Sequence, residues 1–166
     1  MKPHVMYNSG INEWYTPESI INLVYNVMGH IDLDVASSDI ANKTVKAKKY
    51  YTKQSDGLAQ KWYGNVFMNP PYSAKLIQQF AEKLVNERDN IDQAIVLVNN
   101  ATETKWFKKI SQISSAVCFP VGRVKFYAPN GEIASPLQGQ AILYIGDNVQ
   151  SFLDNFSSIG WCAIIQ

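Results

Sequence analysis

The tetrapeptide Asn69-Pro70-Pro71-Tyr72 has the residue types and spacing for chemistry on an aromatic amine. Such an amine is a poor nucleophile because its lone pair is delocalised into the ring. The Asn69 side-chain oxygen and the Pro70 carbonyl would accept hydrogen bonds from the two N–H groups of this amine. They would also stabilise the positive charge that develops on the nitrogen as it attacks an electrophile. The prolines fix these carbonyls without adding backbone donors, and Tyr72 offers a face on which a base stacks. The alternative is a proline-stiffened turn after a strand.

A second group of residues with functional potential is basic. Five lysines fall within eleven residues, beside two tyrosines: Lys43, Lys46, Lys48, Lys49 and Lys53. Beside a site that modifies a base, this run predicts an edge that grips DNA phosphates, and we place Lys48 and Lys49 on it. A solvated surface is the alternative.

The elements that position these residues follow from capping signals and hydrophobic periodicity. Thr16 and Pro17 predict a helix start, with Thr16 as N-cap and Pro17 in the first turn, and the helix would end at Gly29. Alternation over residues 31–35 predicts a short strand. A second strand over 66–68 would stop at the prolines of the motif.

The second half of the chain continues this alternation of helix and strand. Its pattern predicts a helix over 73–85, a buried strand over 94–98, a helix over 102–113, a strand over 116–119 and a β-hairpin over 124–146. Such an order indicates an α/β sandwich with a mostly parallel central sheet that ends in a β-hairpin. Because such sheets bind ligands at the carboxyl ends of their strands, the loops after Val35 and Met68 are expected to form the site.

Length and composition limit the remaining possibilities. The 166 residues predict one domain, 1–166, with residues 1–13 as a flexible N-terminal tail. Hydrophobic residues make up 46% and charged residues 17%, which argues against disorder, and the net charge of +1 means that any nucleic-acid footprint must be local. Cys118 and Cys162 lie in apolar runs, and no cluster of ligand spacing exists, so we expect no metal. No apolar run suits a signal peptide or a bilayer span, so we expect a soluble intracellular protein.

Six short segments then carry a resemblance to a known family. They are Trp14-Tyr15-Thr16-Pro17, Asp32-Leu33-Asp34-Val35-Ala36, Asp56-Gly57-Leu58 with Trp62, Asn69 to Tyr72, Trp106-Phe107 and Gly122-Arg123-Val124-Lys125-Phe126. In this order the sequence resembles, from about residue 12 to 145, the small phage-type Dam-like DNA N-6-adenine methyltransferases. The resemblance implies a Rossmann-like fold, S-adenosylmethionine as cofactor, DNA as partner, and methylation of adenine N6 at specific sites on a flipped base. It also implies a cytoplasmic location, in a bacterium or a phage-infected host cell.

The resemblance further implies a role for individual residues. The catalytic residues would be Asn69, Pro70, Pro71 and Tyr72. The cofactor site would comprise Thr16 and Pro17 at the methionine end, Asp34 on the ammonium, Ala36, Asp39 on the ribose and Asp56 on the adenine amino group. Tyr72, Arg123, Lys125 and Phe126 would contact the target base or the DNA, with Phe126 stacked on the base opposite Tyr72.

One departure from the family pattern keeps alternatives open. The glycine-rich cofactor loop is missing, because Ala36-Ser37-Ser38-Asp39 follows the first strand. Two other activities therefore remain as hypotheses: methylation of RNA or of a protein glutamine by the same fold, and binding of nucleic acid without catalysis.

Overall fold

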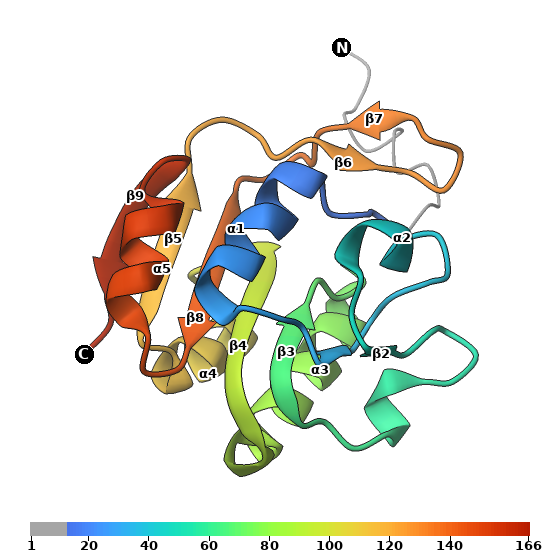
Figure 1. Ribbon diagram of the computed structural model, residues 1–166, viewed down its shortest axis with the longest axis horizontal. Helices are drawn as coiled ribbons and strands as arrows, with labels where there is room; N and C mark the ends of the chain where they lie inside the picture. The colour runs from blue at the N-terminus through green and yellow to red at the C-terminus, as the bar shows by residue number, and fades with distance from the viewer. Residues whose placement is uncertain (1–12) are drawn as a thin grey trace.

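A seven-stranded sheet runs through the centre of the computed structural model, which describes residues 13–166 (Figure 1). In spatial order its strands are β2 (Lys49–Tyr50), β1 (Leu33–Asp34), β3 (Gly64–Met68), β4 (Ile91–Asn99), β8 (Gln140–Ile145), β5 (Ala116–Pro120) and β9 (Gly160–Ile164). Neighbouring strands are parallel from β2 to β4, whereas β8 is antiparallel to β4 and β5, and β9 is antiparallel to β5. The prediction of an α/β fold with a mostly parallel sheet is confirmed, since only β8 and β9 run opposite to the other strands of this sheet.

Helices cover both faces of the sheet (Figure 1). Helices α1 (Glu18–Met28) and α5 (Val149–Phe156) pack on one face, and α3 (Ala74–Asn86) and α4 (Lys105–Ile113) pack on the other. The remaining elements are α2 (Asn42–Val45), the 3₁₀ turns η2 (Gly57–Ala59) and η3 (Arg88–Asn90), and a separate pair of strands, β6 (Phe126–Tyr127) and β7 (Ile133–Ala134). Within residues 13–166, no helix is long and apolar enough to cross a membrane.

Strand β4 shows why the apolar run at its centre is continuous. Val96 and Val98 belong to the core beneath α3 and α4, whereas Ile95 and Leu97 belong to the core beneath α1 and α5. All four side chains are fully buried. A strand covered on both faces needs apolar residues at successive positions, so the sequence pattern predicts this strand correctly.

The first helix differs from the prediction at its start. Pro17 is the N-cap of α1 and makes no side-chain capping bond, so the assignment of Thr16 as N-cap is wrong by one residue. Thr16 is buried, and its hydroxyl accepts a hydrogen bond from the side chain of Asn69 instead. The predicted end is confirmed, because Gly29 adopts a φ of 78°, which a residue without Cβ reaches at little cost.

The predicted hairpin over 124–146 is wrong in extent. Strands β6 and β7 form a short hairpin around residues 128–132, but the chain then enters the main sheet as β8. Every residue of β8 is buried, which suits a central strand rather than the second arm of an exposed hairpin. The backbones of Tyr15 and Tyr127 exchange hydrogen bonds of 2.7 and 3.0 Å, which joins the hairpin to the first described segment. The predicted tail, residues 1–13, lies almost entirely outside the described residues.

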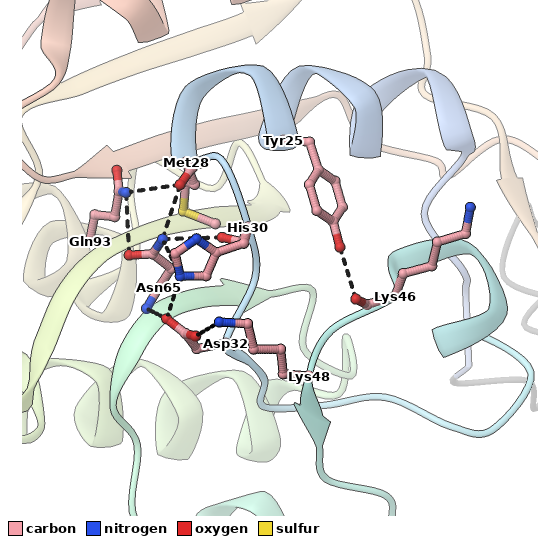
Figure 2. A network of polar contacts seen from close by, with 8 residues as sticks. All are labelled: Tyr25, Met28, His30, Asp32, Lys46, Lys48, Asn65 and Gln93. Atoms are coloured by element: carbon pink, nitrogen blue, oxygen red, sulfur yellow. Dashed lines mark hydrogen bonds and ion pairs between the residues drawn. The ribbon is translucent and has the colours of Figure 1, made fainter.

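A polar network closes the amino-terminal end of the sheet (Figure 2). The Asn65 amide donates to the carbonyls of Met28 at 3.0 Å and His30 at 3.2 Å, and its backbone N–H donates to Asp32 at 2.9 Å. Lys48 Nζ donates to the other oxygen of Asp32 at 2.9 Å. These bonds fasten the end of α1 to β1 and β3.

Candidate active site

A cavity of about 210 Å³ opens at the carboxyl-terminal edge of the parallel strands. Its walls come from the loops that follow β1, β2 and β3, from the segment before α1, and from α3: Glu13, Trp14, Tyr15, Ala36, Ser37, Ser38, Tyr51, Thr52, Lys53, Asp56, Gly57, Leu58, Asn69, Pro70, Pro71, Tyr72, Leu76 and Phe80. This is the edge at which the sequence places the site. All four residues of the proline-containing motif line the cavity.

The side chain of Asn69 is fixed in one orientation. Its Nδ2 donates to the Trp14 carbonyl at 2.8 Å and to the Thr16 hydroxyl at 3.1 Å. Both amide protons are therefore occupied, and Oδ1 is left to face Tyr72. An oxygen held in this way is a preorganised acceptor.

The Tyr72 hydroxyl occupies that acceptor in this structure. It donates to Asn69 Oδ1 at 2.9 Å and lies 3.2 Å from Oε1 of Gln140. Burial raises the pKa of Tyr72, so its phenol remains protonated and is a donor rather than a base. The Gln140 side chain is 1% exposed, and its Nε2 donates to Asn99 Oδ1 at 2.8 Å. Sequence reasoning missed Gln140, because no local pattern marks a residue 68 positions from Tyr72.

Phe126 does not take the predicted position on the far side of a base. Its ring is 1% exposed and lies edge-on against Tyr72, with centroids 6.2 Å apart and planes at 72°. Two rings that sandwich a base would be parallel and separated by the thickness of that base. In this conformation Phe126 supports the Tyr72 ring from the core, as an aromatic T-shaped pair does.

Asp34 does not line the cavity, but it binds the backbone of Ala36, which does. It is 2% exposed, and its Oδ1 accepts a hydrogen bond from the Ala36 backbone at 3.2 Å. Burial raises the pKa of Asp34 to about 7, although hydrogen bonds from Ser37 and Ala36 oppose that rise. Ala36 and Ser37 themselves line the cavity. Among residues 13–166 no basic side chain forms an ion pair with this buried carboxyl group, which suits a ligand that brings a cation.

Of the other two predicted acids, one lines the cavity and one does not. Asp56 is in the cavity wall, and its Oδ1 accepts from the Leu58 N–H at 3.1 Å, which caps η2. Asp39 is absent from the wall, and its carboxylate accepts from the Tyr50 hydroxyl at 2.7 Å on the surface. The assignment of Asp39 to a ribose therefore finds no support. Neither Thr16 nor Pro17 lines the cavity, so within residues 13–166 Thr16 positions Asn69 rather than a ligand.

The predicted DNA contacts divide between two ends of the molecule. Arg123 and Lys125 are exposed just before β6. The Arg123 guanidinium lies beside Gly139, because a Cβ built on this glycine would be 3.1 Å from a guanidinium nitrogen. Gly139 directly precedes Gln140, so Arg123 lies near the start of β8. Lys48 and Lys49, by contrast, lie at the amino-terminal end of the sheet, where Lys48 already pairs with an acid (Figure 2). β2 runs toward the cavity edge, and Lys53, which follows it, lines the cavity. The predicted basic run is therefore divided between the two ends of β2 and does not form a single edge, and contact of Lys48 and Lys49 with DNA stays a prediction.

Comparisons with known proteins concern the family and the fold of the chain. The family model described as DNA N-6-adenine-methyltransferase (Dam) matches residues 6–151. No curated protein matches the sequence.

Three solved structures resemble the chain at low identity. A proposed RNA methyltransferase from Pyrococcus horikoshii has a TM-score of 0.51 and 12% identity, with 87% of this chain and 89% of that chain covered. A dimethyladenosine transferase from Plasmodium falciparum has a TM-score of 0.48 and 12% identity, with 87% and 67% covered. A proposed class I S-adenosylmethionine-dependent methyltransferase from Listeria monocytogenes has a TM-score of 0.49 and 14% identity, with 86% and 64% covered. At 12% identity, the likeness to the first of these structures, whose TM-score is 0.51, concerns the fold alone.

Proposed function

The chain belongs to the Dam family of DNA N-6-adenine methyltransferases, S-adenosylmethionine-dependent enzymes, and from this premise we propose that it methylates adenine N6 at specific sites in DNA, on a base rotated out of the duplex. The observation that carries the proposal is the fixed orientation of Asn69. Its two amide protons are held by Trp14 and Thr16, so its oxygen is fixed facing the Tyr72 hydroxyl. Asn69 and Tyr72 both line the cavity. This is the acceptor that an N6 amine requires.

The proposed reaction needs little movement of protein groups. Asn69 Oδ1 and the Pro70 carbonyl accept the two N6–H groups, which localises the lone pair and stabilises the developing positive charge. When bound, S-adenosylmethionine supplies an electrophilic methyl group on a positively charged sulfur. The adenine nitrogen forms the new N–C bond as the C–S bond breaks, and N6 then loses a proton to water. Tyr72, kept neutral by burial, holds its proton throughout and offers its ring to the base.

The cavity wall fits the chemical groups of this cofactor. Leu58 and Phe80 offer apolar surface for a purine, and Ser37 and Thr52 offer hydroxyl groups within reach of a sugar. The buried carboxyl group of Asp34 suits the ammonium at the methionine end. We propose that Ala36, Asp34 and Asp56 hold the cofactor.

The position of the acceptor supports the proposed rotation of the base. The N6 amine of a paired adenine is inside the duplex, whereas Asn69 Oδ1 is part-buried at the cavity wall. A duplex cannot enter a cavity of about 210 Å³, but a single base can approach it. Arg123 and Lys125, exposed beside this end of β8, would hold the phosphates that flank the rotated base.

The direct test offers the purified protein and labelled S-adenosylmethionine three acceptors: unmethylated DNA, total RNA and a protein extract. Nucleoside mass spectrometry should find N6-methyladenine in the DNA, and sequencing of the product should find it in one sequence context. A label in RNA, or on a glutamine in the extract, with unmodified DNA would overturn the proposal. Duplexes in which that adenine faces a mismatch should react faster if rotation of the base limits binding.

A further inference from the structure

The hydroxyl of Tyr72 competes with the substrate for the catalytic acceptor. A phenol carries one proton, and Asn69 Oδ1 at 2.9 Å is the nearer of the two oxygens that can accept it. In the proposed reaction the same oxygen accepts the target amine. The hydroxyl must therefore lose its hydrogen bond to Asn69 each time a base binds. A buried donor without an acceptor would raise the free energy of the complex.

Gln140 provides the replacement acceptor. Its Oε1 lies 3.2 Å from the Tyr72 hydroxyl, so the proton reaches it by rotation about the C–O bond with no movement of the ring. The amide of Gln140 cannot turn away, because its Nε2 donates to Asn99 Oδ1 at 2.8 Å and its side chain is 1% exposed. Gln140 and Asn69 thus present two fixed oxygens to one hydroxyl, each held by bonds to its own amide nitrogen.

We infer that Gln140 is a positioning residue of the methyl-transfer reaction: it accepts the Tyr72 hydroxyl when the target amine occupies Asn69, and so frees the catalytic oxygen. The inference rests on the proposed function, since it requires an amine at Asn69. Gln140 touches neither the amine nor the methyl group. Its contribution is to the binding of the target base, and cofactor affinity is independent of it.

The test is a double-mutant cycle between Gln140 and Tyr72. Gln140→Met keeps the length of the side chain but removes the acceptor, and Tyr72→Phe removes the competing hydroxyl but keeps the ring. With Tyr72 present, Gln140→Met should lower kcat/KM for DNA about ten- to a hundredfold, chiefly through KM. In the Tyr72→Phe background the same change should have less than about a twofold effect.

Controls separate this role from a structural one. Each variant should be folded at the assay temperature and should keep the wild-type S-adenosylmethionine affinity, both measured by calorimetry. Should Gln140→Met not fold, Asn99→Ala takes its place: it releases the Gln140 amide, and its smaller effect should likewise vanish in the Tyr72→Phe background.

Two results would overturn the inference, and they are distinguishable. Equal losses in the Tyr72 and Phe backgrounds, with an active wild type, would show that Gln140 acts only by holding β8, and the proposed function would stand. A wild-type protein that leaves DNA unmethylated would overturn the proposed function and this inference with it.

Discussion

Replacing Asp34 by asparagine should stabilise the protein at neutral and alkaline pH. Asp34 is 2% exposed, and burial raises its pKa from 3.8 to about 7. Because the folded pKa lies above the unfolded one, the charged form is penalised in the folded state. This penalty is absent below pH 3.8, grows as the pH rises, and is complete above pH 7.

The magnitude follows from the two pKa values. One pKa unit corresponds to about 1.4 kcal/mol. Ionised Asp34 therefore lowers the free energy of unfolding by at most about 4 kcal/mol at pH 8, and by about 1 kcal/mol at pH 4.5. These are upper limits, because a buried carboxylate draws in water and lets its surroundings relax. Asparagine is neutral at every pH, and its side-chain oxygen can still accept the Ala36 N–H that binds Asp34 now.

Urea unfolding at pH 4.5 and pH 8 measures the effect. The advantage of Asp34→Asn over wild type should grow by about 1–3 kcal/mol between the two pH values. Taking the difference between variant and wild type removes the contribution of all other titrating groups, and Asp39→Asn controls for the loss of one surface carboxylate. An Asp34→Asn protein that is destabilised equally at both pH values would refute the reasoning.

Three further predictions concern the cofactor and DNA. The S-adenosylmethionine affinity of wild type should fall as the pH drops below 7, because Asp34 must then lose a proton on binding; calorimetry should detect this proton release at pH 6 and not at pH 8. Asp34→Asn should bind about ten- to a hundredfold more weakly at pH 8. Gly57→Ala should lower the free energy of unfolding in urea by about 1–3 kcal/mol and weaken cofactor binding, because a Cβ at this position would collide with the Val35 carbonyl oxygen. An unchanged free energy of unfolding would contradict this packing. Arg123→Gln should weaken binding to every duplex alike and reduce the slope of log affinity against log salt by about 0.9. Lys48→Gln, whose ammonium is already paired away from the cavity, should leave the slope unchanged, and equal slopes for all three proteins would remove Arg123 from the DNA contact.

The strands and the motif could be predicted because their signals are local. Two prolines must end β3 wherever it lies, and a continuous apolar run at 94–98 must be covered on both faces. The position of the cavity then follows from the rule that parallel sheets bind ligands at the carboxyl ends of their strands. The N-cap was misplaced by one residue because Thr16 has a better partner in Asn69, 53 positions away, which no local rule detects.

The failures share one physical cause, which is long-range packing. The predicted hairpin is too long because the turn residues at 129–131 do not indicate which strand the following segment pairs with. That segment is β8, which lies between β4 and β5. Phe126 is aromatic and could stack on a base by residue type, but its ring is buried edge-on against Tyr72. Gln140 had no signal at all, since a buried polar residue is identified only by the partners that satisfy it.

The most direct test of the central claim, that the Asn69 oxygen activates the target amine, is the single-turnover rate of methyl transfer to DNA by wild type and Asn69→Ala. Loss of one preorganised acceptor should lower the rate by about 10²–10³-fold. S-adenosylmethionine affinity should stay within a few-fold of wild type, because Asn69 bonds to Trp14, Thr16 and Tyr72 rather than to the cofactor residues. A near-wild-type rate in Asn69→Ala would contradict the account.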